Sequence, residues 1–281
     1  MSDFEKLRIV TRYEFLKHIR RRRLWIILGL ALLVEALVLI LTPILLKHYP
    51  QDVVLPFGAG TIKGVTSMAT LLTFGPTLAA LGAVFFSGDA IAGEFENKTG
   101  FLLFTTPVKK FVLWSGKYLA CYLAVVLLII FTYIIIAVSL LAIYHTVPLT
   151  IFKSFGLCLL YAAAVLSVTF LFSSFSKGAM GATVITLVFI WVISGIVQSV
   201  LSFTGNPYWF MISAQGDSVY LVYGGIRALA QGLGGSGANL GNGNGPAISE
   251  LNIGLAAVGM VIYLVVGFVA SVRLAGRRQL A

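Results

Sequence analysis

The stretch that decides the fold runs from Gly93 to Lys117 and reads Gly-Glu-Phe-Glu-Asn-Lys-Thr-Gly-Phe-Leu-Leu-Phe-Thr-Thr-Pro-Val-Lys-Lys-Phe-Val-Leu-Trp-Ser-Gly-Lys. It is the longest charged segment between apolar runs. Each flanking run has about twenty residues, which is enough for a helix to cross a hydrocarbon core of roughly 30 Å. We therefore interpret 88–117 as a loop at the membrane face. Its charged ends and apolar centre indicate a docking element for a soluble partner.

The composition places the chain among all-α integral membrane proteins. Hydrophobic residues make up 59% and charged residues 11%, against about 25% charged residues in soluble domains. The formal charge of +10 does not indicate a nucleic-acid partner, because most basic residues flank apolar runs, where they orient helices in the membrane. Cys121 and Cys158 lie in apolar runs without motif spacing, so we expect neither a disulfide nor a metal site.

Residues 1–23 are polar and basic and contain no proline or glycine, which favours a helix. Three apolar residues, Ile9, Tyr13 and Leu16, share one face of this helix. Three basic residues lie on the same face: Lys6, Lys17 and Arg20. Two interpretations stay open. The helix lies in the membrane interface with its basic side chains reaching the headgroups, or it is a solvated basic leader. In either case Arg20 to Arg23 meet anionic lipid and mark the cytoplasmic side.

Six membrane spans are predicted over the remainder of the chain, which forms one domain over 24–281. They cover about 24–46, 65–87, 118–143, 153–175, 179–203 and 251–272. The first is too long for a signal peptide and lacks a cleavage site, so it is retained as a span. An even number of spans places both termini on the same side.

The basic residues test this topology. Eight Lys and Arg residues lie in the N-terminal segment, four in the 88–117 loop, one in the turn at Lys177 and three in the C-terminal tail, and only four lie on the opposite side. Cytoplasmic loops are enriched in these residues. The sequence therefore predicts a multi-pass protein of the cell membrane with both termini and the 88–117 loop in the cytoplasm.

Several residues are candidates for a cavity or gate. Gly75-Pro76 falls near the middle of the second span, where proline removes a helical hydrogen bond and kinks or breaks the helix. Glu35 is the one acidic residue in the middle of a span, and such residues face protein or a water-filled cavity. Its role is either contact with a cavity or substrate, or a hydrogen bond to a neighbouring helix through Gln198, Ser194 or Thr73.

The outer segment, 204–250, has two unlike halves. The first contains Tyr208 and Trp209 within an aromatic-rich stretch, which favours short interfacial or re-entrant helices. The second, from Gly234 to Pro246, is rich in glycine, asparagine and serine and is expected to be a flexible loop. We include Gln198, Tyr208 and Trp209 among the gate candidates.

No catalytic constellation is present in the sequence. The three histidines, at His18, His48 and His145, are isolated and have no partner at metal-ligand spacing. Gly116-Lys117 is not a phosphate-binding motif, because the required earlier glycine and the following Ser or Thr are missing. We expect no enzyme activity and no cofactor on this chain. If ATP powers the protein, another chain binds it.

Within the central loop, Asn97 or Thr99 would cap a short helix that runs through Phe104, and Pro107 would end or restart it. Charged ends and an apolar face are typical of a helix that docks in a groove of a partner. The alternative is an amphipathic loop that rests on lipid.

At these residues the chain resembles permeases of type-2 ATP-binding-cassette (ABC) exporters. The residues that match the family pattern are, in order, Glu94-Phe95-Glu96, Lys98-Thr99-Gly100, the apolar Phe101 to Phe104, Thr105-Thr106-Pro107-Val108-Lys109-Lys110 and Gly116-Lys117. Thr99-Gly100 reverses the family's usual Gly-Thr order, and Lys110 replaces its usual arginine. The basic N-terminal helix, the six spans and the long outer segment extend the resemblance over nearly the whole chain.

The resemblance implies a permease that exports its substrate by alternating access, with ATP and Mg²⁺ bound by separate ATPase subunits. It implies a second permease chain, identical or not, and an outer segment that closes the external gate. The implied ATPase-coupling residues are Glu94, Phe95, Glu96, Thr99, Gly100, Phe101, Leu102, Phe104, Pro107 and Lys110. The apolar spans suit a hydrophobic or amphipathic substrate. The competing hypotheses are a non-transporting scaffold or force-transmitting partner of an ATPase, and a stand-alone channel or carrier.

Overall fold

A computed structural model describes residues 2–48, 75–96, 109–145, 147–223 and 251–277, and within these ranges the chain is helical with no strand. Its helices, in chain order, are α1 (Asp3–Arg20), α2 (Arg22–His48), α4 (Gly75–Ser87), α5 (Ala92–Glu96), α7 (Lys110–Tyr144), α8 (Thr150–Phe175), α9 (Ala179–Leu187), the π-helical η1 (Val188–Ile193), α10 (Ser194–Phe203), α11 (Ile212–Leu221) and α13 (Ile253–Arg277).

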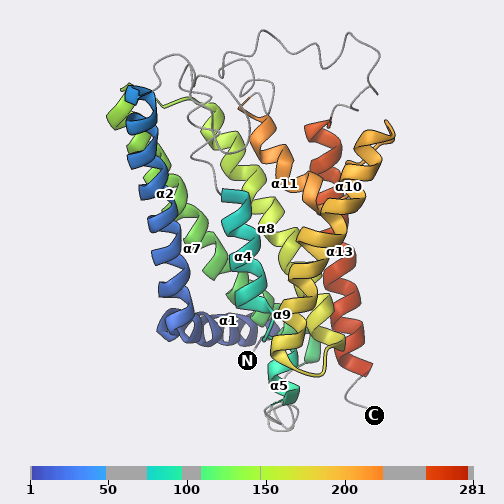
Figure 1. The fold of residues 1–281 in the computed structure, drawn as a ribbon. Helices are drawn as coiled ribbons and strands as arrows, with labels where there is room; N and C mark the ends of the chain where they lie inside the picture. Colours follow the sequence, from blue (N-terminus) through green and yellow to red (C-terminus); the bar gives the residue numbers. More distant parts are fainter. Residues whose placement is uncertain (1, 49–74, 97–108, 146, 224–250, 278–281) are drawn as a thin grey trace.

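The long helices stand side by side, and α1 lies across one end of them (Figure 1). This end, which also holds α5 and the last turn of α13, is called the α1 end below. The helix α1 begins with a capping box: the Ser2 hydroxyl accepts a hydrogen bond from the Glu5 amide, and the Glu5 carboxylate accepts one from the Ser2 amide. These contacts satisfy amides that a helix start leaves unpaired, so α1 is a defined helix that contacts α7 and α2.

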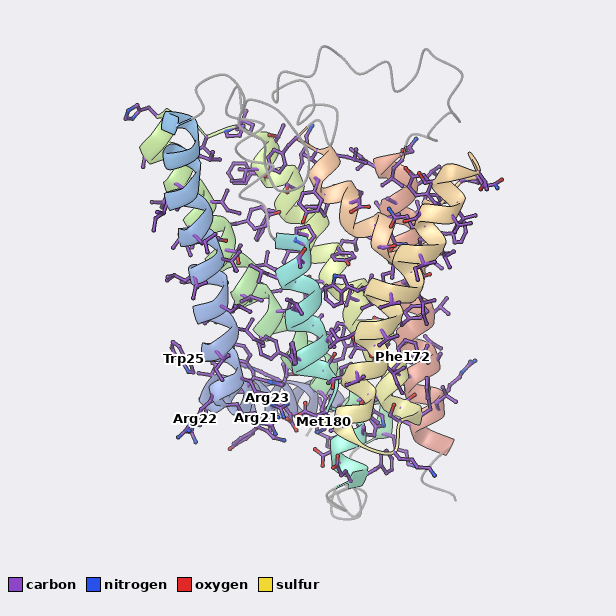
Figure 2. All side chains as sticks on the ribbon, in the orientation of Figure 1. Arg21, Arg22, Arg23, Trp25, Phe172 and Met180 are labelled. Atoms are coloured by element: carbon purple, nitrogen blue, oxygen red, sulfur yellow. The ribbon has the colours of Figure 1, made fainter. Side chains whose placement is uncertain are left out.

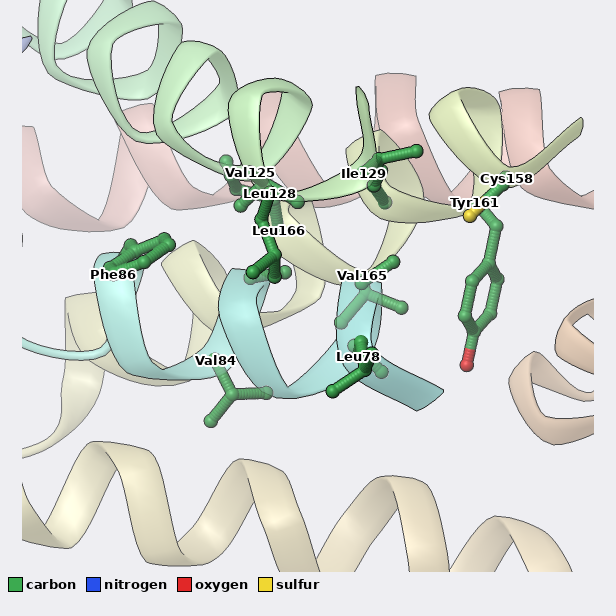
Figure 3. Packing of buried hydrophobic residues seen from close by; sticks show 14 of the residues in the cluster. Leu78, Val84, Phe86, Val125, Leu128, Ile129, Cys158, Tyr161, Val165 and Leu166 are labelled. Carbon is green, nitrogen blue, oxygen red and sulfur yellow. The ribbon is translucent and has the colours of Figure 1, made fainter. Parts of the chain in front are cut away.

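The core lies where α4, α7 and α8 meet. Figure 3 shows Leu78 and Phe86 of α4 beside Leu128 of α7 and Leu166 of α8, and all four are at most 4% exposed. Packing of side chains between α4 and α7 depends on glycine. A Cβ at Gly82 would lie 2.8 Å from Leu128 Cδ2. Small residues at such positions let membrane helices pack by van der Waals contact, where lipid offers no hydrophobic driving force.

Five helical segments are long and apolar enough to cross a membrane within the described ranges: Gly75–Glu96, Lys110–Ala142, Thr150–Phe175, Ala179–Ser202 and Ile253–Gly276. The predicted span 24–46 corresponds to α2, a helix of 27 residues, whose outer side chains lie outside the described part. The count of six spans therefore stays a prediction. Residues 65–74 of the predicted span 65–87 also lie outside the described part of the chain.

The predicted 88–117 loop is wrong over its last eight residues, because α7 begins at Lys110 and includes Lys117. The charges of these lysines suggested a membrane face. Lys117 is instead neutralised by two carboxylates inside the protein, so the helix continues without interruption through the apolar Phe111 to Trp114. The third span is thus eight residues longer at its start than the sequence indicated.

Candidate functional site

The α1 end is organised by Lys117, whose side chain is 4% exposed. Its ammonium lies 2.6 Å from Glu94 Oε1 of α5 and 2.9 Å from Glu14 Oε1 of α1. A buried charge is stable only when paired and hydrogen-bonded, and here one cation serves two anions on different helices. Lys117 of α7 therefore ties α5 and α1 to the bundle.

A second ion cluster holds the corner between α1 and α2. Asp89, in the turn after α4, accepts hydrogen bonds from Arg21 Nη1 at 2.7 Å and Arg23 Nη1 at 2.9 Å. Figure 2 shows the two arginines together at this corner, with Arg22 and Trp25. Charge-assisted bonds of this kind are stronger than neutral ones, so they fix the start of α2 against α4.

The segment that leads into α5 is anchored to α8 and α9. The Ser173 hydroxyl donates to the Gly88 carbonyl at 2.8 Å and accepts from the Ala92 amide at 3.0 Å. Glu96 Oε2 accepts from the Ala179 amide at 2.8 Å, at the N-terminus of α9. A carboxylate satisfies an unpaired amide there and is favoured by the helix dipole. Any displacement of α5 therefore acts on α9 as well as on α7 and α1.

A cavity of about 950 Å³ opens at this end between α1, α2, the end of α4, α5 and α9. Its lining combines charged and apolar side chains. The acidic and basic residues of the lining are Glu14, Lys17, Arg21, Arg23, Asp89, Glu94, Glu96 and Lys117, beside the imidazole of His18, and the apolar lining includes Ile26, Ile27, Leu30, Phe85 and Met180. The formal charges of its acidic and basic residues cancel, four against four.

His18 is 7% exposed, with Nε2 3.4 Å from Cys121 Sγ. Burial lowers the pKa of His18 to about 4, against the opposing effect of the Asp89 carboxylate, so the imidazole is neutral at pH 7. The thiol of Cys121 also donates to the Phe86 carbonyl. Among the described residues, no group of three or more His, Cys, Asp or Glu side chains could hold a metal ion. We assign the contact between His18 and Cys121 to the packing of α1 on α4 and α7.

At the opposite end, hydrogen bonds join α10 to α11. The Ser194 and Ser213 hydroxyls are 2.8 Å apart, and Gln198 Nε2 donates to Asp217 Oδ2 at 2.6 Å. Ser194 and Gln198 are four residues apart in α10, and their partners in α11, Ser213 and Asp217, are four residues apart in the same order. The two helices therefore run in the same direction. The chain must therefore return by the length of α10, roughly 14 Å, before α11 begins. Gly205, at φ 71°, makes the turn that follows α10.

Comparison with known protein families matches residues 10–193 to the model described as "ABC-2 family transporter protein". The chain belongs to the ABC-2 transporter family. The search among curated proteins found no match. The matched range includes α1 from Val10 onward, the ion clusters of the α1 end and the cavity. This chain is thus the multi-pass membrane permease of an ABC-2 transporter, a family whose permeases work with an ABC ATPase subunit.

The predicted coupling residues of this ABC-2 permease separate into two groups. Glu94, Phe95 and Glu96 form the last three residues of α5, and Lys110 begins α7. The others lie outside the described residues: Thr99, Gly100, Phe101, Leu102, Phe104 and Pro107. Glu94 and Glu96 were expected to face a partner, yet both bind groups of this chain. Sequence reasoning missed Lys117 and Glu14 as the network of Glu94, because only the fold brings α1, α5 and α7 together. It also missed Asp89, which binds Arg21 and Arg23 in a separate cluster.

The gate candidates do not form one site. Gly75 and Pro76 are the first residues of α4 and are buried, so the predicted kink lies at the border of the described part. Glu35 is 0% exposed on α2, and neither of its oxygens has a hydrogen-bond partner among the described groups. Its predicted partners Gln198 and Ser194 are wrong, because these bind α11 instead, and Thr73 lies outside the described residues.

Tyr208 and Trp209 lie just before α11, and the Trp209 ring packs edge-on against Phe210. They therefore belong to the segment that connects α10 to α11. Asp217 was not among the sequence candidates. A signal for it exists in the sequence, since it is a single acidic residue in an otherwise uncharged aromatic stretch.

Proposed function

We propose that this permease is the membrane half of an exporter in which two permease chains and two ATPase subunits move a hydrophobic or amphipathic substrate by alternating access. The observation that carries the proposal is the attachment of α5. Glu94 binds Lys117 of α7, and Glu96 binds the start of α9. A push on α5 by an ATPase would therefore reach the helices that line the cavity.

The α1 end faces the cytoplasm in this proposal. It receives sixteen of the twenty Lys and Arg residues if the topology predicted from the sequence holds. The helices α1 and α5 and the C-terminal end of α13 all lie at this end (Figure 1). A cytoplasmic ATPase would then meet α5 and the 97–108 segment that follows it.

The second permease chain would contact the face formed by α9 and α10. Side chains of this segment are mostly exposed, and a Cβ at Gly181 or Gly195 would meet nothing within 4 Å. Small residues on an exposed membrane helix favour contact with another helix. Two such faces would enclose a path, and the π-helical η1 within this span marks a place where the helix can adjust.

The first test is affinity purification of the tagged full chain in mild detergent, with identification of partners by mass spectrometry and a measurement of ATP hydrolysis. We expect an ABC ATPase to be present in a fixed ratio to the permease, and ATP hydrolysis by the purified complex. If the chain purifies without an ATPase, the proposed function is wrong. If the complex hydrolyses ATP with no substrate response and no transport, a scaffold is favoured.

The role of α5 needs a separate test with Glu94→Gln and Glu96→Gln. We expect both variants to retain the ATPase in purification but to lose transport in reconstituted vesicles, since these residues bind their own chain. Lys109→Met is the control, because its ion pair with Asp3 is exposed. Loss of the ATPase without loss of thermal stability would instead show that Glu94 and Glu96 contact the partner directly.

A further inference from the structure

Two arginines in the lining of the cavity share one carboxylate. Arg21 Nη1 and Arg23 Nη1 both donate to the same oxygen, Asp89 Oδ2, at 2.7 and 2.9 Å. A guanidinium group has five N–H donors, and within the described part of the chain each of these two makes this one side-chain hydrogen bond. Their side chains are 37% and 54% exposed. The pair therefore keeps accessible donors, and its two positive charges face one negative charge.

The wall of the cavity continues from Arg23 along one face of α2. Ile26, Ile27 and Leu30 follow Arg23 at the spacing that places residues on the same side of a helix, and all of them line the cavity. From Arg23 to Leu30 the helix rises roughly 10 Å. Ile26 and Leu30 are exposed. An apolar surface therefore begins directly beside the guanidinium group of Arg23.

The arginine pair lies at the level of lipid headgroups. The helix α1 lies across the ends of the spans, whereas α2 stands beside them (Figure 1). Figure 2 shows Trp25 next to the arginines at this corner, and its side chain is exposed. Tryptophan collects at the membrane interface, and a helix that lies across the spans at their end marks the headgroup region. The two arginines are therefore at the depth of phosphate groups, and the apolar face of α2 beyond them is at the depth of acyl chains.

The charge of the lining restricts the kind of phosphate compound that fits. The four acidic and four basic residues cancel, so the cavity as a whole does not compensate the several charges of a nucleotide or another polyphosphate. A phosphodiester carries one negative charge, which the arginine pair can compensate beside Asp89. Arginine also matches the geometry of phosphate oxygens with paired N–H groups. A glycerophospholipid, which joins one phosphodiester to apolar chains, satisfies both parts of the cavity.

We propose that the cavity at the α1 end binds one glycerophospholipid, with its phosphodiester on Arg21 and Arg23 and an acyl chain along the apolar face of α2. The sequence does not distinguish among Arg20 to Arg23, whereas Arg21 and Arg23 are the two of these four that line the cavity within the described chain. This inference rests on the proposed function for one consequence only. Because α5 lines the same cavity, lipid binding and the position of α5 would affect each other.

The test uses the purified full chain in detergent micelles and a phosphatidylglycerol with a photoreactive diazirine in its acyl chain, a lipid whose only charge is the phosphodiester. After illumination, labelled residues are located by mass spectrometry. We expect saturable labelling of residues 26–30 that excess unlabelled phosphatidylglycerol suppresses. Free glycerol phosphate should not suppress it, because it lacks the apolar chains. Val266 of α13, exposed and outside the cavity lining, is the reference for unspecific lipid contact.

The phosphate half of the site is tested by two double variants of equal charge. Arg21→Gln with Arg23→Gln should weaken lipid binding at least about tenfold, which corresponds to about 1.4 kcal/mol. The matched control is Arg20→Gln with Arg22→Gln, which removes the same charge from the same segment outside the cavity lining. This control should leave the labelling of residues 26–30 unchanged.

The apolar half is tested without any change to the ion cluster. Leu30→Gln should weaken the labelling several-fold, whereas Leu33→Gln, at another exposed position of α2 outside the cavity lining, should not. Both side chains are exposed, so neither substitution should change the thermal unfolding midpoint appreciably.

The inference is overturned if labelling of residues 26–30 does not saturate, if glycerol phosphate competes as well as the lipid, or if the two arginine double variants have equal effects. Absence of labelling there in a chain that is dimeric in solution would assign the cavity to a second copy of the chain instead. Because the assay needs no ATPase, failure of this site and failure to find an ATPase partner are separate results.

Discussion

At the scale of the residue, Lys117 has the largest structural role at the α1 end. It is buried in α7 and binds two carboxylates that come from α1 and α5. Lys109, eight residues earlier, also pairs with an acid of α1, but that pair is exposed. The two lysines therefore form a matched comparison between a buried and an exposed ion pair.

Lys117→Met should lower the free energy of unfolding by about 3 kcal/mol, because removal of one partner leaves buried carboxylates uncompensated. The measurement is the thermal unfolding midpoint in detergent. Lys109→Met should change it little, since exposed ion pairs contribute little. Equal effects of the two substitutions would contradict the assignment of Lys117 as the central tie.

His18 gives a prediction on pH. Its pKa is lowered to about 4 by burial, whereas the unfolded residue titrates near 6.5. Between these values the unfolded chain binds a proton that the folded chain does not, so stability falls as pH falls from 6.5 towards 4. His18→Phe should remove this contribution, which is at most about 1.4 kcal/mol per pH unit.

The measurement is the unfolding midpoint as a function of pH for wild type, His18→Phe and the control His145→Gln, which alters an exposed histidine. Glu14 affects the stability of the protein at lower pH than His18 does. Burial raises its pKa, but Lys117 and Lys17 outweigh this and hold it below 4.5, so its contribution is lost only below that pH. Parallel curves for wild type and His18→Phe would show that His18 is not buried as a neutral group.

At the scale of the element, the contact between α1 and α7 depends on one glycine. A Cβ at Gly116 would lie 2.7 Å from Val10 Cγ1 and 3.0 Å from Val10 Cβ. Such distances are too short for real contacts, so any larger residue at this position must displace α1. This gives a physical reason for the glycine in the Gly116-Lys117 pair: the glycine admits α1, and the lysine binds it.

Gly116→Ala should destabilise the protein although alanine favours helices over glycine by about 1 kcal/mol. Val10→Ala in the same chain should relieve part of the effect, because it removes the methyl group nearest to the added Cβ. A double-mutant cycle by thermal unfolding measures this coupling. Gly156→Ala, in α8 with nothing within 4 Å, is the control and should be neutral or stabilising. Additive effects at Gly116 and Val10 would disprove the close contact.

At the scale of the whole molecule, the bundle has two chemically different ends. The α1 end holds the ion clusters and the cavity, and the opposite end holds α11 with its carboxylate, Asp217. The proposed function requires the first end to face the cytoplasm and the second to face outward. This orientation can be measured without knowledge of the substrate.

Cysteine labelling tests the orientation in a chain whose buried Cys121 and Cys158 are replaced by alanine. Leu149→Cys, at an 82% exposed position between α7 and α8, should react with a membrane-impermeant maleimide in intact cells. Arg12→Cys, at an exposed position of α1, should react only after permeabilisation. The reverse pattern would place the α1 end outside and remove the proposed meeting point with the ATPase.

The sequence alone determined the membrane class, the family and the approximate position of the long helices, because apolar length and flanking charge are local properties of the chain. Only the tertiary structure decided the roles of individual charged residues. Glu94 and Glu96 had the pattern of docking residues, yet they bind Lys117 and α9, and Gln198 binds Asp217 rather than Glu35. The physical reason is that the cost of burying a charge depends on which distant groups the fold places beside it.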